Sequence, residues 1–246
     1  PLLQSSAASD VYKRQVRSAW MSFKSAVITF PGSNCDRDAL CYLKDLTKGE
    51  VHNIWHEETS LPKVDLVILP GGFSFGDYLR SGAMASKSKI IDEVVKHAND
   101  NRYLLGICNG FQILTEIGLL EGALIRNKKL KFLGKNCFIK KKFKNNFNLS
   151  IKDNQVLQIP VAHNEGNFYC DTETLNLLKN NEQIAFEYCK GEFSNTEENI
   201  NGSIEAIAGI TNKKKNVLGM MPHPERAYSD FHQSQDGRLI IESLIS

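Results

Sequence analysis

The cysteine at position 108 stands in a pattern that could make it a nucleophile. An apolar run at 104–107 leads directly into Cys108, with Gly106 before it and Gly110 after it. This G-x-C-x-G pattern is the thiol counterpart of the G-x-S-x-G elbow, a sharp turn from a strand into a helix. Small neighbours allow the nucleophile a positive φ, and a helix N-terminus favours its thiolate. The alternative is a buried cysteine between two packing glycines.

A histidine and a glutamate near the C-terminus could supply a base and the group that orients it. His223 and Glu225 lie in the sequence M-P-H-P-E-R, where each proline biases the preceding residue toward extended geometry. In an extended segment these two side chains lie on the same side. The carboxylate can then bind one imidazole nitrogen and leave the other for a thiol, which predicts a Cys–His–Glu triad. The alternative is that H-P-E occurs here by chance in a surface loop, where the histidine has only a structural role.

Two backbone amides are candidates for an oxyanion hole. The amide of Asn109 faces the same space as the Cys108 thiol if a helix starts there. Gly72 belongs to a Pro-Gly-Gly turn after an apolar run, and paired glycines let amides approach a ligand closely. Sites in open α/β sheets gather outside the carboxyl ends of strands. We therefore predict Gly72 and Asn109 as oxyanion donors, with an ordinary turn at 70–72 as the alternative.

The first half of the chain alternates between the two element types that such a site needs. Apolar periodicity predicts strands at 26–30, 51–55, 65–69 and 103–107 and helices at 36–46, 90–98 and 110–120. Continuous apolar strands separated by helices indicate a parallel sheet covered on both faces.

The second half has a different pattern. Residues 124–157 are rich in Lys, Asn and Phe and indicate antiparallel strands; later strands are expected at 204–208 and 217–220, and a helix at 235–245. The predicted fold class is therefore α/β, with a single open, mostly parallel sheet, helices on both faces and an added antiparallel β region in the second half.

Composition sets limits on the classes of protein. The chain has 246 residues, of which 41% are hydrophobic and 24% charged, so it can bury a sizeable core, and wholesale disorder is excluded. The net charge of +2 gives no general argument for nucleic acid or an anionic membrane. Residues 126–152 hold ten Lys or Arg and no Asp or Glu. We interpret this segment as a solvated β region, with partner docking and then nucleic-acid contact as alternatives.

The six cysteines form no C-x-x-C pair and no zinc-type grouping with the six histidines. We expect five of them to be free, mostly buried thiols of a reducing cytosol, with Cys108 as the exception. Residues 1–20 lack an apolar signal region and are expected to be a non-native or disordered tail before Met21. The remaining residues, 21–246, are expected to form one domain.

Six stretches together resemble the class I triad glutamine amidotransferases, and most closely their branch of glutaminase subunits of phosphoribosylformylglycinamidine synthase. They are F-P-G-S-N-C-D at 30–36, P-G-G-F-S-F-G-D-Y-L-R-S-G-A at 70–83, G-I-C-N-G-F-Q at 106–112, A-H-N-E-G-N-F at 162–168, G-M-M-P-H-P-E-R at 219–226 and D-G at 236–237. The resemblance covers the chain from Met21 onward and implies a flavodoxin-like amidotransferase fold.

The resemblance implies roles for individual residues. Cys108 would attack the side-chain amide of L-glutamine, His223 would act as base and then acid, and Glu225 would orient it. The amides of Gly72 and Asn109 would hold the oxyanion. Four further residues stand where the family contacts glutamine: Gln112, His163, Asn164 and Gly166.

The resemblance also implies partners. Ammonia would pass to a separate ATP-dependent synthetase subunit that converts formylglycinamide ribonucleotide to formylglycinamidine ribonucleotide in purine biosynthesis, and a small third subunit would bridge the two. ATP and Mg²⁺ are expected on that synthetase, and no cofactor or metal in this chain, which has no G-x-x-x-x-G-K-[ST] loop. Neither a nucleic acid nor a membrane is expected as a partner, and the expected location is the cytoplasm.

One departure from the family pattern concerns the stretch where H-G-E-G is expected. This chain has Asn164 in place of the glycine, and asparagine is the least costly replacement if the glycine serves a positive φ. Three rival readings remain: another class I triad glutaminase, a non-catalytic binding protein on the same fold, and a nucleic-acid-binding protein using the Lys-rich segment. The G-D-Y-L-R stretch argues against the first, and the intact triad argues against the second.

Overall fold

The computed structural model describes residues 23–191 and 198–245. The expected N-terminal tail at 1–20 lies outside the described residues. Nine of the described strands form one sheet in the order β2-β1-β3-β4-β11-β10-β9-β6-β7, and two more, β5 and β8, form a small antiparallel sheet.

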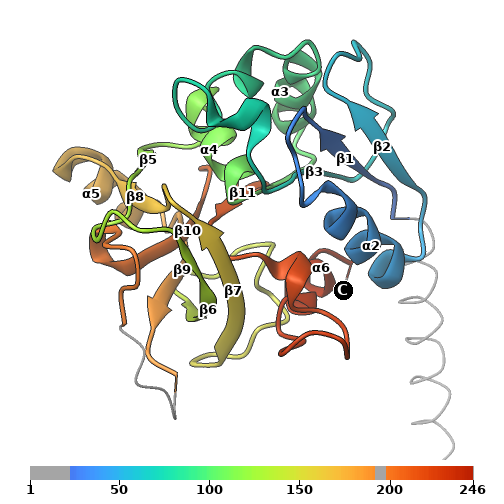
Figure 1. Ribbon diagram of the computed structural model, residues 1–246. Helices are drawn as coiled ribbons and strands as arrows, with labels where there is room; N and C mark the ends of the chain where they lie inside the picture. Colours follow the sequence, from blue (N-terminus) through green and yellow to red (C-terminus); the bar gives the residue numbers. More distant parts are fainter. Residues whose placement is uncertain (1–22, 192–197, 246) are drawn as a thin grey trace, which may run out of the picture.

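One half of the large sheet is parallel. Its strands are β2 (Val51–Trp55), β1 (Ser25–Thr29), β3 (Leu66–Leu69), β4 (Tyr103–Ile107) and β11 (Val217–Met220). Every residue of β3 and β11 is buried, because helices cover both faces. Figure 1 shows α3 (Ile91–Asn99) and α4 (Asn109–Glu116) on one side of these strands and α2 (Asp36–Thr47) and α6 (Arg238–Ile245) on the other.

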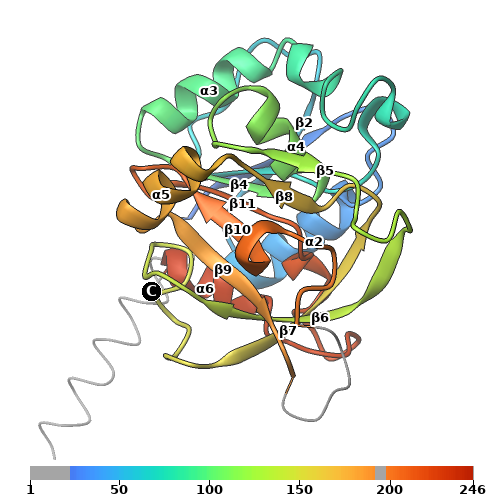
Figure 2. The ribbon, with the colours of Figure 1, turned by 90° about the vertical axis from the view of Figure 1, so that its left-hand side faces the viewer.

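The other half of the sheet is antiparallel and continues directly from β11. Its strands are β10 (Ile207–Thr211), β9 (Ile184–Cys189), β6 (Leu133–Lys141) and β7 (Val156–His163). Figure 2 shows these strands extending the sheet beyond β4 and β11. The small sheet pairs β5 (Ala123–Ile125) with β8 (Asn167–Tyr169), and α5 (Thr172–Asn180) follows β8. The predicted α/β class with an added antiparallel region is confirmed.

Several element boundaries differ from the predictions. The strand expected at 204–208 is wrong at its start: Ile204–Ala206 form a 3-10 turn in which Glu205 and Ala206 have φ of 47° and 57°. The helix expected to reach residue 120 ends at Glu116. Helix α5 and strand β9 were not predicted. The N-cap of α5 is Asp171, whose side chain accepts a hydrogen bond from the Thr174 amide.

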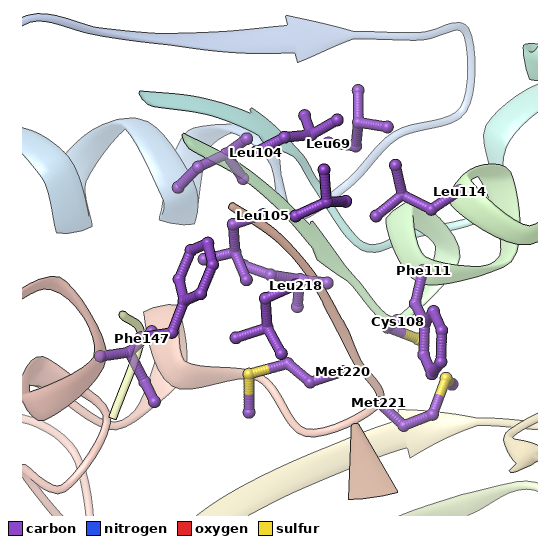
Figure 3. Close-up of a cluster of buried hydrophobic side chains, with 14 of the residues drawn as sticks. Leu69, Leu104, Leu105, Cys108, Phe111, Leu114, Phe147, Leu218, Met220 and Met221 are labelled. Carbon is purple, nitrogen blue, oxygen red and sulfur yellow. The ribbon is translucent and has the colours of Figure 1, made fainter. Parts of the chain in front are cut away.

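Close packing brings the start of α4 against the carboxyl ends of two strands. A Cβ added to Gly110 would lie 1.9 Å from the carbonyl oxygen of Leu69, at the end of β3. Figure 3 shows Cys108 where β4 runs into α4, with Phe111 of that helix beside it. Both side chains belong to the buried apolar core, together with Leu69. In the described part of the chain, no helix is long and apolar enough to cross a bilayer.

Candidate active site

Cys108 occupies a strained turn at the end of β4. Its φ is 50° and its ψ is −103°, outside the ordinary regions for a residue with a side chain. Its amide donates to the carbonyl of Met220 at 2.8 Å, and Asn109 is the first residue of α4. This is the strand-to-helix elbow that the spacing of the glycines predicts. It places the sulfur at the carboxyl edge of the sheet.

The sheet brings the predicted base to the same edge. Strand β11 lies beside β4 in parallel, with Met220 opposite Ile107, so the segment after β11 emerges next to Cys108. His223 and Glu225 are both buried, and their side chains meet with Nδ1 and Oε1 2.6 Å apart. The carboxylate therefore binds one imidazole nitrogen and leaves Nε2 available to a thiol, as predicted.

The surroundings of His223 favour its charged form. Burial by itself lowers the pKa of this imidazole, but the charges of Glu225 and Cys108 more than offset burial and raise it well above the usual range. The Nε2 atom has no hydrogen-bond partner in the described part of the chain. The Cys108 thiol faces the carbonyl of Ala162 at 3.6 Å. Thiol and imidazole are thus neighbours that are not yet bonded, as is common before substrate binds.

The two predicted oxyanion donors border this edge. Gly72 follows β3, has a φ of 125° and lines a cavity together with Cys108. A Cβ at Gly72 would lie 2.7 Å from the amide nitrogen of Asn34, so the position requires glycine. The amide of Asn109 lies in the first turn of α4, where helix amides have no partner within the helix.

The cavity has a volume of about 100 Å³. Its lining is Gly72, Phe73, Asp77, Ser81, Cys108, Gln112, Ala162, His163, Asn164 and Glu165. Three of the four residues expected to contact glutamine are therefore on its wall. The fourth, Gly166, lies under the His163 ring, because a Cβ there would come within 2.3 Å of the ring. We assign to Gly166 the packing of His163.

His163 is buried and neutral. Its Nδ1 lies 3.1 Å from Oδ1 of Asn127, an oxygen that also accepts the Gly166 amide at 3.1 Å. Because Asn127 presents an acceptor, Nδ1 carries the proton and Nε2 is an acceptor, for which the described residues provide no partner. Burial, and then the charge of His223, lower the pKa of His163 to about 3.

Asn164 was expected to replace a family glycine that serves a positive φ, and this explanation is wrong. Asn164 does not have a positive φ, and its side chain is exposed, so the loop does not need glycine-like backbone freedom there. Gln112 is held at both ends of its amide: it donates to the Glu165 carbonyl at 2.6 Å and accepts from the Asn109 side chain at 2.9 Å. Direct contact of either residue with glutamine stays a prediction.

Cys35, one of the five cysteines expected to have no chemistry, lies beside the triad. Atoms of Cys35, His223 and Glu225 that could bind a metal ion all lie within 4.8 Å of one another. Burial raises the pKa of the Cys35 thiol, although His223 pulls it down. The sequence did offer one signal for placing Cys35 near the site: it follows β1 and belongs to the first family-like stretch, at 30–36.

Three further cavity residues were not singled out from the sequence. Asp77 and Ser81 lie in the second family-like stretch, and Glu165 lies in the fourth. The Ser81 hydroxyl donates to Oε2 of Glu165 at 2.9 Å, which joins the two loops across the cavity. Their position in family-like stretches was visible, but which side chains face inward depends on loop geometry.

The comparison with known proteins agrees with this geometry. Residues 22–239 match the CobB/CobQ-like glutamine amidotransferase domain. The chain belongs to this amidotransferase family. The buried Cys–His–Glu arrangement therefore lies in a chain whose whole described fold is that of an amidotransferase domain.

Individual relatives of this amidotransferase are similar over nearly their full length. It is 48% identical over 224 residues to the phosphoribosylformylglycinamidine synthase subunit PurQ of Pelagibacter ubique, covering 90% of this chain and 98% of that protein. It is 46% identical to the PurQ subunit of Novosphingobium aromaticivorans, with coverage of 92% and 97%. A chain in the structure of PurLQS from Thermotoga maritima superimposes with a TM-score of 0.81 at 37% identity, covering 92% and 98% of the two chains.

Proposed function

We propose that this chain is the glutaminase subunit of phosphoribosylformylglycinamidine synthase. It hydrolyses L-glutamine to glutamate and ammonia for the ATP-dependent conversion of formylglycinamide ribonucleotide to formylglycinamidine ribonucleotide. The observation that carries the proposal is the Cys108 elbow beside the buried His223–Glu225 pair, in a chain 46–48% identical to PurQ subunits over almost their whole length.

The site supports a thioester mechanism. His223 takes the proton of Cys108, and the thiolate attacks the amide carbon of glutamine. Amides of Gly72 and Asn109 hold the oxyanion, and Glu225 stabilises the imidazolium. The intermediate collapses, the carbon–nitrogen bond breaks, and His223 gives its proton to the departing ammonia. Water activated by His223 then hydrolyses the glutamyl thioester to glutamate and free thiol.

The same proposal assigns partners and surroundings. Ammonia passes to a synthetase subunit that binds ATP and Mg²⁺, and a small subunit bridges the two chains. The similarity to a chain in the PurLQS structure supports this assembly. The chain itself works without a bound metal or cofactor, in the cytoplasm. Support for the reducing location comes from its six cysteines, all free in the structure.

The Cys108→Ala variant tests the proposed function in the complex with synthetase and bridging subunits. We expect glutamine-dependent formation of formylglycinamidine ribonucleotide to fall to background, because the nucleophile is gone. Synthesis from added ammonia should continue, because the partner's chemistry does not use Cys108. The measurement is the rate with each nitrogen source. Equal loss of both would contradict the role assigned to this chain.

A further inference from the structure

We propose that Asp77 binds the α-ammonium group of the amide substrate and thereby selects glutamine over amides that lack it. The inference rests on the proposed function and concerns the same cavity. Asp77 lies on the cavity wall shared with Cys108. The side chain of Asn109, the residue next to the nucleophile, donates to Oδ1 of Asp77 at 3.3 Å. The carboxylate and the thiol therefore line the same small cavity, of about 100 Å³.

Asp77 is a carboxylate without a cation. No Lys, Arg or His in the described part of the chain lies within ion-pair distance of it. Glu165, the other carboxylate in the cavity, accepts from Ser81 at 2.9 Å and has Arg126 3.8 Å away. Of the two, Asp77 is the one whose charge is left for a ligand.

Neighbouring groups make that charge costly while the cavity lacks a cation. Burial, partly opposed by the nearby Ser81 hydroxyl and helped by the negative charge of Glu165, raises the pKa of Asp77 to about 6. The other titratable groups on the cavity wall are Cys108 and neutral His163. A bound ammonium would relieve the repulsion between the carboxylates and keep Asp77 ionised at neutral pH.

A second, independent feature shows that the cavity is built for a hydrogen-bond donor. His163 is 3% exposed and lines the cavity, and its Nε2 is an acceptor without a partner. Buried acceptors are rarely left unpaired unless a ligand satisfies them. A carboxylate and a free imidazole acceptor that line one cavity suit a substrate that carries N–H groups at both ends. L-Glutamine has an amide at one end and an ammonium at the other.

A purely structural role for Asp77 makes a different prediction. Asp77 could serve only to hold Asn109 at the start of α4, and its loss would then impair every amide equally. The Asp77→Asn substitution should not disturb the backbone at this position. Asp77 has a φ of 51°, and asparagine tolerates this region as well as aspartate does. The Asp77→Asn variant therefore removes the charge and keeps the turn.

The experiment compares two substrates in the assembled complex. Hydrolysis of L-glutamine is measured beside that of glutaramate, which is glutamine without its α-amino group. We expect the wild type to prefer glutamine in kcat/KM by about 10- to 100-fold, the range for one charged hydrogen bond. In Asp77→Asn this preference should fall to about one, through a higher KM for glutamine. The control is Asp92→Asn, an exposed aspartate of α3 outside the cavity, which should keep the wild-type preference.

The pH dependence gives a second readout. Protonation of Asp77 at low pH removes its charge, so the wild-type KM for glutamine should rise as the pH falls through about 6. The KM of Asp77→Asn should lack this rise. Equal loss of activity on both amides, or an unchanged preference, would overturn the inference and leave the proposed function standing. Hydrolysis of neither amide by the wild type would overturn both.

Discussion

Several catalytic side chains bury polar atoms that lack a hydrogen-bond partner among the described residues, which costs folding free energy. His223 and Glu225 are each 1% exposed, and in the described part of the chain one atom of each, Nε2 and Oε2, has no hydrogen-bond partner. A buried unpaired polar atom costs about 1–3 kcal/mol. Cys108 adds backbone strain at its positive φ. Such costs gather at catalytic centres, because an atom already paired cannot serve the substrate.

The Glu225→Gln variant tests how the carboxylate acts on its neighbour. Glutamine keeps the shape but loses the charge that raises the pKa of His223. We expect kcat for glutamine hydrolysis to fall about 100- to 10,000-fold, as when the orienting acid of other triads is neutralised. Steady-state kinetics in the complex measures this loss. A kcat within a factor of about three of wild type would remove Glu225 from the triad.

The same variant has a pH signature in stability. Folding raises the pKa of His223, so the protonated imidazole stabilises the wild type fully below the unfolded value of about 6.5. That stabilisation is lost as the pH rises through the higher folded pKa. The difference in free energy of unfolding between wild type and Glu225→Gln should therefore shrink with rising pH. Urea denaturation at several pH values measures it, and a constant difference would contradict the ion pair.

At the scale of elements, glycines set how closely the site can be assembled. Gly110 brings α4 against the end of β3, and Gly106 brings β4 against α4, where an added Cβ would lie 2.7 Å from the Gly110 carbonyl. Neither glycine has a positive φ, so the requirement is for space. Because the nucleophile lies between them, its position depends on this contact.

The Gly110→Ala variant tests that contact. A methyl group 1.9 Å from the Leu69 carbonyl oxygen must push α4 away from β3. We expect a loss of about 3–5 kcal/mol in the free energy of unfolding, or a protein that does not fold. The matched variant is Gly134→Ala in β6, where the nearest atom is 3.3 Å away on the exposed Phe132 side chain. Its stability should change by less than about 1 kcal/mol. Similar stability of both in urea denaturation would contradict the packing argument.

Element prediction from the sequence succeeded where one signal dominated. The buried parallel strands carry continuous apolar runs, as at Leu66–Leu69, and glycine spacing marked the elbow at Cys108. The strand expected at 204–208 began wrongly because I-E-A-I-A alternates like a strand, while the backbone makes a turn at Glu205. Helix α5 was missed because only Leu175 and Leu178 of it are buried, too short a stripe to stand out.

Prediction of the site stopped at the inward-facing loops. The triad could be placed because its residues follow strand ends that share one edge of the sheet. Cys35, Asp77 and Glu165 could not be assigned, because their neighbours belong to other segments of the chain. The angle at which a loop turns its side chains inward has no periodic signal in the sequence.

At the scale of the whole molecule, ion pairs partly neutralise the positive charge of the Lys-rich segment at 126–152. Lys141 pairs with Asp153 at 2.7 Å and Lys142 with Glu187 at 3.1 Å, both acids lying outside the Lys-rich segment. The segment includes β6, within the large sheet. The side chain of Lys141 is only 14% exposed, so this lysine is paired rather than solvated, and the interpretation of the whole segment as a solvated β region stays a prediction.

The isolated chain is expected to be a weak glutaminase. The Cys108 thiol faces the Ala162 carbonyl while Nε2 of His223 has no partner, so the proton-transfer contact is not yet made. We expect glutamine hydrolysis by the chain alone to be at least about tenfold slower than in the assembled complex, because the partners complete the arrangement. Hydrolysis rates with and without the synthetase and bridging subunits measure this. Equal rates would show that the chain needs no partner to become active.

The order of strands in the sheet also determines when activity can arise during synthesis. Cys108 is synthesised well before β11, the strand that delivers His223 and is inserted between β4 and β10. Until then β4 has an open edge, and the two halves of the sheet have no strand to join them. A nascent chain therefore carries the nucleophile without its base and cannot consume glutamine. Because this central strand is synthesised after the nucleophile, ammonia release has to wait until β11 has been made and inserted into the sheet.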